Sequence, residues 1–162
     1  MIKNKYDLKY YLRHDAIALG RNPGKHPSMF PYSDIIWKYQ RLYRKYEYMR
    51  NTMHGRPFRI AFAAILKIRF DCMSQRLGFS LPINVFGPGL SIAHYGSLVV
   101  NSNTQVGSNC RIQENVTIGA TNGGSEAPHI GNNVFIGSSA VLLGGIVIAD
   151  DIAIGAGAVV TH

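Results

Sequence analysis

The sequence predicts a mainly β fold: a parallel β-helix over residues 79–162, preceded by an α-helical region over residues 1–78. Two observations predict it. From residue 100 onward, aliphatic residues recur every six positions, and no amphipathic helix has that period. The first region instead spaces its apolar residues as helices do, and it contains all of the 17 lysines and arginines except Arg111. The two regions are therefore different kinds of sequence.

The repeats keep one frame through the second region, with a single interruption. Their second position is often glycine and their fifth is small or β-branched. Three short strands would form one triangular coil, so that first-position residues stack from coil to coil, fifth-position residues fill the corners and the glycines permit the turns. Stacked coils bury a continuous core that no single repeat could bury. A β-sandwich with coincidental spacing is the alternative. The first positions are Val100, Val106, Ile112, Ile118, Ile130, Ile136, Leu142, Ile148 and Ile154.

Three helices are predicted in the first region. The first covers residues 7–19 and ends at Gly20. The second runs to residue 53, with Ser33 as its N-cap. The third begins with Pro57 in its first turn and ends at residue 77, before Gly78.

Composition limits the cellular compartments in which the chain is expected. Charged residues occupy the positions where a signal peptide needs an apolar run, and the apolar stretch 60–66 is too short to span a bilayer. We therefore expect no integral membrane segment. With only Cys72 and Cys110, a disulfide framework is not expected, and a reducing cytoplasm is the simplest setting. No histidines or cysteines have a metal-ligand spacing, so no metal is expected.

A histidine precedes the repeats in the segment Gly-Leu-Ser-Ile-Ala-His94-Tyr-Gly96. Together with the repeats, this segment resembles the hexapeptide-repeat acyltransferases, a family that includes serine acetyltransferases and related sugar and polysaccharide acetyltransferases. The resemblance covers roughly the last half of the chain. It implies a left-handed β-helix, acetyl-CoA as the acetyl donor and His94 as the general base. An imidazole, with a pKa of about 6.5 when unperturbed, suits removal of a hydroxyl proton at neutral pH. An exposed or structurally satisfied histidine is the alternative.

The resemblance also implies a groove for acetyl-CoA that is lined by small residues. The loop 119–129 interrupts the repeats, and such a loop beside a rigid scaffold is a common place for function. We expect oxyanion-stabilising N–H groups near its start, and substrate contacts from Asn101 and His129. The alternative is that the small residues are ordinary repeat residues. The positions that match the cofactor groove are Gly119, Ala120, Thr121, Gly137, Ser138, Ala140, Gly155, Ala156 and Ala158.

Departures from the serine acetyltransferase pattern bear on the acceptor. Where those enzymes carry two aspartates and a loop histidine, this chain has Pro82, Ala93 and Ala127. The predicted acceptor is therefore a hydroxyl of a sugar or polysaccharide precursor, as in the capsule and exopolysaccharide branch. The alternatives are serine O-acetylation in cysteine biosynthesis and a non-catalytic structural or binding β-helix. The candidates for orienting His94 are Asn84, Asn101 and Glu114.

The expected partners follow from the same resemblance. The family usually forms homotrimers with active sites between subunits, and helices would cap the open end of the solenoid. A C-terminal isoleucine, with which serine acetyltransferases dock into cysteine synthase, is missing, so that complex is not expected. The basic, aromatic segment 37–48 raises the alternative of binding to nucleic acid or to an anionic membrane surface. Its tyrosines fit helix packing at least as well, and nucleic-acid binding is not predicted.

Overall fold

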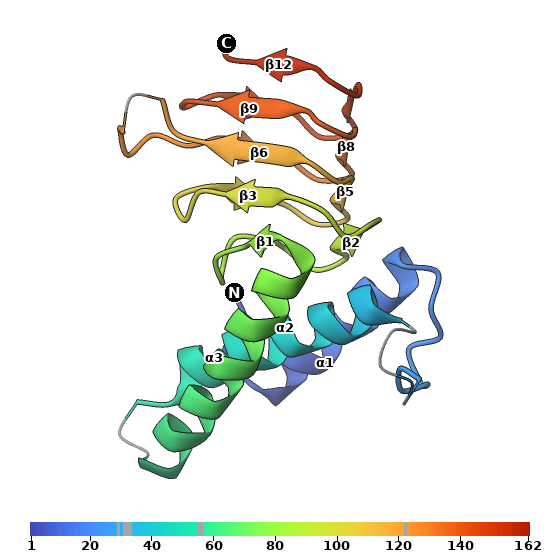
Figure 1. The fold of residues 1–162 in the computed structure, drawn as a ribbon, viewed down its shortest axis with the longest axis vertical. Coiled ribbons are helices and arrows are strands. Elements are labelled where there is room, and N and C mark those ends of the chain that lie inside the picture. Colours follow the sequence, from blue (N-terminus) through green and yellow to red (C-terminus); the bar gives the residue numbers. More distant parts are fainter. Residues whose placement is uncertain (29, 31–33, 55–56, 122) are drawn as a thin grey trace.

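The structure is a computed structural model that describes the whole chain except residues 29, 31–33, 55–56 and 122. Three helices lie at one end of a stack of short strands (Figure 1). They are α1 (Lys5–Ala18), α2 (Ile35–Thr52) and α3 (Pro57–Leu77).

The helix ends agree with the predictions to within two residues at each described boundary. Helix α1 begins earlier than predicted because the side chain of Asn4 caps it by accepting from the amide of Asp7. The predicted N-cap Ser33 lies outside the described residues. Asp34 directly precedes α2 and makes no capping hydrogen bond through its side chain.

The strands form three parallel sheets, and each strand belongs to a different sheet from the one before it. Three consecutive strands therefore complete one coil, as predicted. Sheet A contains β1 (Phe79–Ser80), β3 (Leu98–Val100), β6 (Val116–Gly119), β9 (Val141–Leu143) and β12 (Val159–Val160). Sheet B contains β4 (Gln105–Val106), β7 (His129–Ile130) and β10 (Val147–Ile148). Sheet C contains β2 (Ser91–Ile92), β5 (Arg111–Ile112), β8 (Phe135–Ile136) and β11 (Ala153–Ile154).

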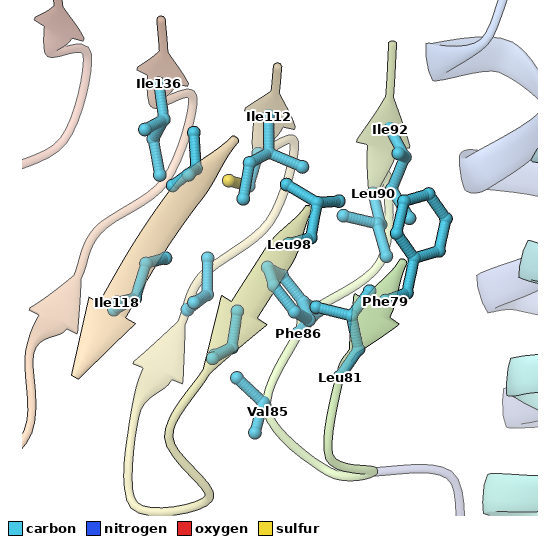
Figure 2. Packing of buried hydrophobic residues seen from close by; sticks show 14 of the residues in the cluster. Phe79, Leu81, Val85, Phe86, Leu90, Ile92, Leu98, Ile112, Ile118 and Ile136 are labelled. Carbon is cyan, nitrogen blue, oxygen red and sulfur yellow. The ribbon is translucent and has the colours of Figure 1, made fainter. Parts of the chain in front are cut away.

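The core of the β-helix is a ladder of first-position aliphatic residues (Figure 2). In sheet C, Ile92, Ile112, Ile136 and Ile154 pair in register from coil to coil. Fifth-position residues fill the corners, where Cys110, Val116, Val134 and Ala140 are buried. This packing confirms the predicted roles of both repeat positions.

The predicted role of the repeat glycines was wrong. The left-handed backbone of most turns lies at the fourth position, for example at Asn109 and Asn133, with φ values of 58° and 56°; in the repeat 142–147 it lies at the third position, Gly144, with φ 82°. The second-position glycines instead allow adjacent coils to approach closely. A Cβ on Gly137 would lie 2.6 Å from the backbone nitrogen of Ala156. These glycines are therefore required by packing between coils rather than by backbone conformation.

The helices cover the open edge of the first coil, as predicted. The amide group of Gln40 donates to the carbonyl oxygen of Leu90 (2.7 Å) and accepts from the amide of Ile92 (3.1 Å). Asp15 accepts from the amides of Gly89 and Leu90, each at 2.9 Å. Side chains of α1 and α2 thus replace the hydrogen bonds that a further coil would supply.

A buried ion cluster completes this interface. The fully buried guanidinium of Arg44 contacts the carboxylates of Asp15 (2.8 Å) and Glu47 (3.1 Å). It also donates to the carbonyl oxygens of Phe86 and Gly87. Burial raises the pKa of Glu47, and the charge of Arg44 opposes that shift. The cluster fixes the segment that leads into β2, and His94 follows that strand.

Among the residues that the structure describes, no helix is both long and apolar enough to cross a membrane.

Candidate active site

His94 lies at the corner where the chain leaves sheet C and turns toward sheet A. Ile92 pairs with Ile112 and Val100 pairs with Ile118, so the His94 turn spans 100 − 92 = 8 positions where the next coil spans 118 − 112 = 6. The two additional residues let the turn project. The imidazole of His94 is exposed and makes no hydrogen bond to another described residue. Its ring nitrogens are therefore available to an acceptor.

Positions that follow sheet C define a column at this corner, and in the longer first turn Gly96 also lies against Glu114. Each position of the column lies two residues beyond a paired isoleucine of sheet C. The coils stay in contact through backbone hydrogen bonds, such as that from the amide of Ala93 to the carbonyl oxygen of Ile112. The members of this corner column, from the helical end upward, are His94, Glu114, Ser138 and Ala156.

Glu114 is the carboxylate nearest to His94 in this column. Its side chain is half-buried, and Oε2 is buried without a hydrogen-bond partner among the described residues. Hydrogen bonds from its own amide and from the hydroxyl of Ser138 lower the pKa of Glu114, and the charge of His94 acts in the same direction. Glu114 is therefore ionised at neutral pH, with one oxygen free.

The other two orienting candidates lie elsewhere. Asn84 exchanges hydrogen bonds with Asn51 of α2. Asn101 follows β3, and its side-chain oxygen accepts from the amide of Asn103 (2.8 Å). None of the three candidates lines the cavity that contains His94, but the charge of His94 acts on the carboxylate of Glu114. Of the three candidates, Glu114 is therefore the one that interacts electrostatically with His94.

A cavity of about 310 Å³ opens beside His94, between the first coils and the ends of α1 and α2. Arg21, which follows α1, pairs with Asp34 at 2.7 Å. Arg111 projects from β5, lies 3.5 Å from the hydroxyl of Ser91 and forms no ion pair with a described residue. Aromatic residues Trp37 and Tyr95 also line the cavity. No sequence motif marks these residues as site residues, although Arg111 stands out as the single lysine or arginine beyond residue 78.

The predicted cofactor positions fall in two places. Ser138, Gly155 and Ala156 reach the surface at the corner column or next to it, whereas Gly137 and Ala140 are buried and Ala158 is half-buried. The first three positions, 119–121, begin at the last residue of β6, at the other end of sheet A. A strand rises about 3.3 Å per residue, so the three steps along β6 from Val116 to Gly119 alone span about 10 Å. A single chain therefore does not bring all nine positions, or an oxyanion hole near Gly119, to His94.

The predicted substrate contacts also lie apart from His94. His129 is exposed on β7, beside a second hollow of about 500 Å³ next to the loop 119–129. Asn103 holds that loop by donating to the carbonyl oxygen of Ser125 (2.9 Å). Within the described ranges, no three histidine, cysteine, aspartate or glutamate side chains are grouped so as to hold a metal ion.

Comparison with known sequences gives two kinds of match. Residues 127–162 match the family described as Bacterial transferase hexapeptide (six repeats). The chain is 41% identical over 167 residues to a serine acetyltransferase of Helicobacter pylori, covering 99% of this chain and 87% of the relative. It is 37% identical over 111 residues to a putative colanic acid biosynthesis acetyltransferase, WcaB, of Escherichia coli, covering 68% and 65%.

Solved structures give a similar result. The serine acetyltransferase of Brucella abortus matches with a TM-score of 0.65 at 26% identity, covering 98% of this chain and 65% of that one. The Neisseria gonorrhoeae serine acetyltransferase in complex with serine matches with a TM-score of 0.69 at 26% identity, covering 97% and 63%. The Brucella enzyme has also been solved with coenzyme A. The chain thus spans just under two thirds of these solved chains, and the matches confirm a left-handed parallel β-helix that follows helices.

Proposed function

We propose that this chain, which belongs to the hexapeptide-repeat acetyltransferase family that includes the serine acetyltransferases, acetylates a hydroxyl of a sugar or polysaccharide precursor. Its relatives are acetyltransferases, and solved members bind coenzyme A, so acetyl-CoA is the acetyl donor. The proposal concerns the acceptor, the residues that act on it and the assembly that completes the site.

In this proposal His94 is the general base. Its neutral imidazole takes the acceptor's hydroxyl proton while the oxygen attacks the thioester carbonyl. The tetrahedral intermediate collapses, the carbon–sulfur bond breaks, and the imidazolium returns the proton to the thiolate of coenzyme A. Such proton transfer contributes about 10²- to 10⁴-fold to a rate. Glu114 stabilises the imidazolium from the next coil, because its carboxylate is ionised and has a free oxygen.

Acetyl-CoA is proposed to lie along the corner column, where Ser138 and Ala156 offer little side-chain bulk above Glu114. The small residues 119–121 lie at the opposite end of sheet A, so they would complete this groove only from a neighbouring subunit. That separation supports a homotrimer with its active sites between subunits, because a trimer of three-sided coils brings different corners together.

The observation that carries the sugar proposal is the charge of the cavity beside His94. Free serine presents an ammonium group, which calls for a carboxylate partner in the site. Among the described residues that line the cavity, the single carboxylate is Asp34, and Arg21 already pairs with it at 2.7 Å. Ala93 adds no carboxylate, and at Pro82 the chain offers only a carbonyl oxygen, which accepts from Tyr43 (2.8 Å). A neutral or anionic hydroxyl acceptor suits this cavity better than serine.

Serine O-acetylation is the second candidate. It is favoured by the 41% identity to the Helicobacter pylori serine acetyltransferase over nearly the whole chain. A non-catalytic β-helix is the third candidate, and in that case the exposed imidazole of His94 would have no catalytic role.

One assay separates these candidates. The purified chain is incubated with acetyl-CoA and either L-serine, a panel of sugars and nucleotide sugars, or buffer alone, and the acetylated product is followed by mass spectrometry. We expect product with a sugar acceptor and a loss of about 10²- to 10⁴-fold in His94→Ala. Product with serine alone would overturn the sugar proposal, and no product with any acceptor would favour the non-catalytic alternative.

A further inference from the structure

We propose that the acceptor carries an anionic group, a phosphate or a carboxylate, which Arg111 and Arg21 bind in the cavity beside His94. The inference rests on the proposed function, because it names the chemistry of that acceptor. The observation behind it is the position of Arg111, a residue that neither a motif nor the repeat pattern requires to be arginine.

Arg111 is the single cation in a region that is otherwise acidic. Residues 79–162 contain one arginine against Glu114, Glu126, Asp150 and Asp151, which gives 1 − 4 = −3, whereas the whole chain carries +8. The β-helix therefore places its one positive side chain in the wall of the cavity that contains His94. Register explains the position: Arg111 lies opposite Ser91 on β2, three residues before His94.

The guanidinium of Arg111 has free hydrogen-bonding capacity. Its contact with a described partner is a long one, 3.5 Å to the hydroxyl of Ser91, and no carboxylate within the described ranges pairs with it. A guanidinium presents five N–H donors in a planar fork that matches a carboxylate or a phosphate. An exposed arginine without a partner at the wall of a catalytic cavity is thus equipped to bind an anion.

Arg21 supplies the second cation from the helical side. Its side chain is half-exposed, and Nη2 of its guanidinium forms an ion pair with the carboxylate of Asp34. The remaining donors of that guanidinium can face the cavity, and Asp34 holds the side chain in place. The described lining therefore carries two guanidiniums against one carboxylate, which leaves an excess of positive charge.

The rest of the cavity suits a sugar ring. Its volume, about 310 Å³, is at the lower end of the range for small-molecule sites. Tyr95, next to His94 in sequence, is 71% exposed, so its ring is free to pack against the acceptor. A monosaccharide that bears one phosphate or one carboxylate would pack its ring against Tyr95 and present its anionic group to the arginines.

The phosphates of acetyl-CoA are the competing source of an anion. In the proposed groove the cofactor runs along Ser138 and Ala156, away from the helices, whereas Arg21 lies on the helical side of the cavity. The two sources therefore predict opposite effects. Loss of Arg111 should raise KM for the acceptor if the acceptor supplies the anion, and KM for acetyl-CoA if the cofactor does.

The test measures binding before activity. Isothermal titration of the full chain with glucuronate, glucose 1-phosphate and glucose should show at least one anionic sugar binding about ten-fold or more tightly than glucose. Arg111→Gln should weaken that binding by about ten- to hundred-fold, the range for a hydrogen bond to a charged group. Arg76→Gln, which removes an exposed arginine that lines no cavity described here, should leave it unchanged. The glucuronate and phosphate arms identify which anion is bound.

Three outcomes would overturn the inference: glucose binding as tightly as both anionic sugars, no binding of any of the three, or an Arg111→Gln effect confined to KM for acetyl-CoA. Acetyl transfer to neutral sugars that Arg111→Gln leaves unchanged would also overturn it, while the proposed function would stand. Transfer to serine alone would overturn the proposed function itself, so the two failures are distinguishable.

Discussion

The carboxylate of Glu114 lies one coil beyond the imidazole of His94, at the same corner of the β-helix. The coils are close here, since a Cβ on Gly96 would lie 3.1 Å from the Cβ of Glu114. The sequence offers no aspartate at positions 82 and 93, which are the positions expected to carry one. The structure supplies a carboxylate from the next coil instead, through stacking rather than through the local sequence.

Glu114→Gln is expected to lower kcat by about three- to ten-fold, because the imidazolium formed in the reaction loses a neighbouring negative charge. The depressed pKa of Glu114 keeps the wild-type carboxylate ionised above pH 5, so its charge stays constant across the assay range. Removing a carboxylate disfavours a protonated neighbour, so the acid limb of the pH–rate profile should move to lower pH.

Steady-state kinetics from pH 5 to 9 check this prediction. Glu114→Asp should recover part of the rate, KM for acetyl-CoA should not change, and Glu126→Gln, on the exposed loop, should behave as wild type. An unchanged pH profile in Glu114→Gln would show that this carboxylate has no electrostatic effect on the base.

The six-residue frame made the coil, the stacking of first-position residues and the corner residues predictable from sequence. It did not make the neighbours of His94 predictable. The turn that carries His94 is two residues longer than the repeat unit, so a frame that begins at Val100 cannot be extended back through it. Glu114 could therefore be named as a candidate, but not chosen over Asn84 and Asn101.

The helical contribution was less predictable still. Helix periodicity marks where α1 and α2 run, but it does not specify which of their polar residues face the first coil. Asp15, Gln40 and Arg44 read as ordinary surface residues, yet all three are fully buried against the segment before β2. Arg21 and Arg111 likewise line one cavity only because the segment after α1 lies near β2 and β5, which is long-range information. The role of the second-position glycines was mispredicted because a residue without a Cβ suits both a left-handed turn and close packing between coils.

Asp15→Asn should destabilise the protein strongly, because it leaves the buried charge of Arg44 short of its main partner. Breaking a buried pair costs about 3–5 kcal/mol. At 2–4 °C per kcal/mol for a chain of this size, the melting temperature should fall by roughly 6–20 °C. Asp71→Asn, which removes an exposed pair with Lys67, is the matched control and should change little. Equal melting temperatures for the two variants in thermal denaturation would contradict a structural role for the cluster.

The two cysteines should differ sharply in reactivity. Cys110 is 1% exposed, and burial raises the pKa of its thiol to about 12, so almost no thiolate forms at pH 8. Cys72 is exposed on α3. A chromogenic disulfide reagent should titrate one thiol per native chain and two in denaturant, and Cys72→Ser should leave none in the native chain. Rapid titration of two native thiols would mean that the corner around Cys110 opens readily.

Gly137→Ala and Gly155→Ala form a matched pair that tests why the repeats contain glycine. Both glycines occupy the second repeat position, and neither has a positive φ. A Cβ on Gly137 would meet the Ala156 nitrogen at 2.6 Å, and because that atom is backbone it cannot move aside without separating two coils. Such overpacking costs about 1–3 kcal/mol.

A Cβ on Gly155 would meet nothing within 4 Å in the described chain. Alanine there restricts the unfolded chain and should be neutral or stabilising by up to about 1 kcal/mol. Thermal unfolding of the two variants should therefore give shifts of opposite sign or clearly unequal size. If both variants unfolded at the same temperature, close packing between coils would not explain the glycines. A backbone conformation required at every second repeat position would then be the explanation. A covering subunit over the last coil would instead make Gly155→Ala destabilising only in the assembled form, which size-exclusion chromatography of both variants would detect.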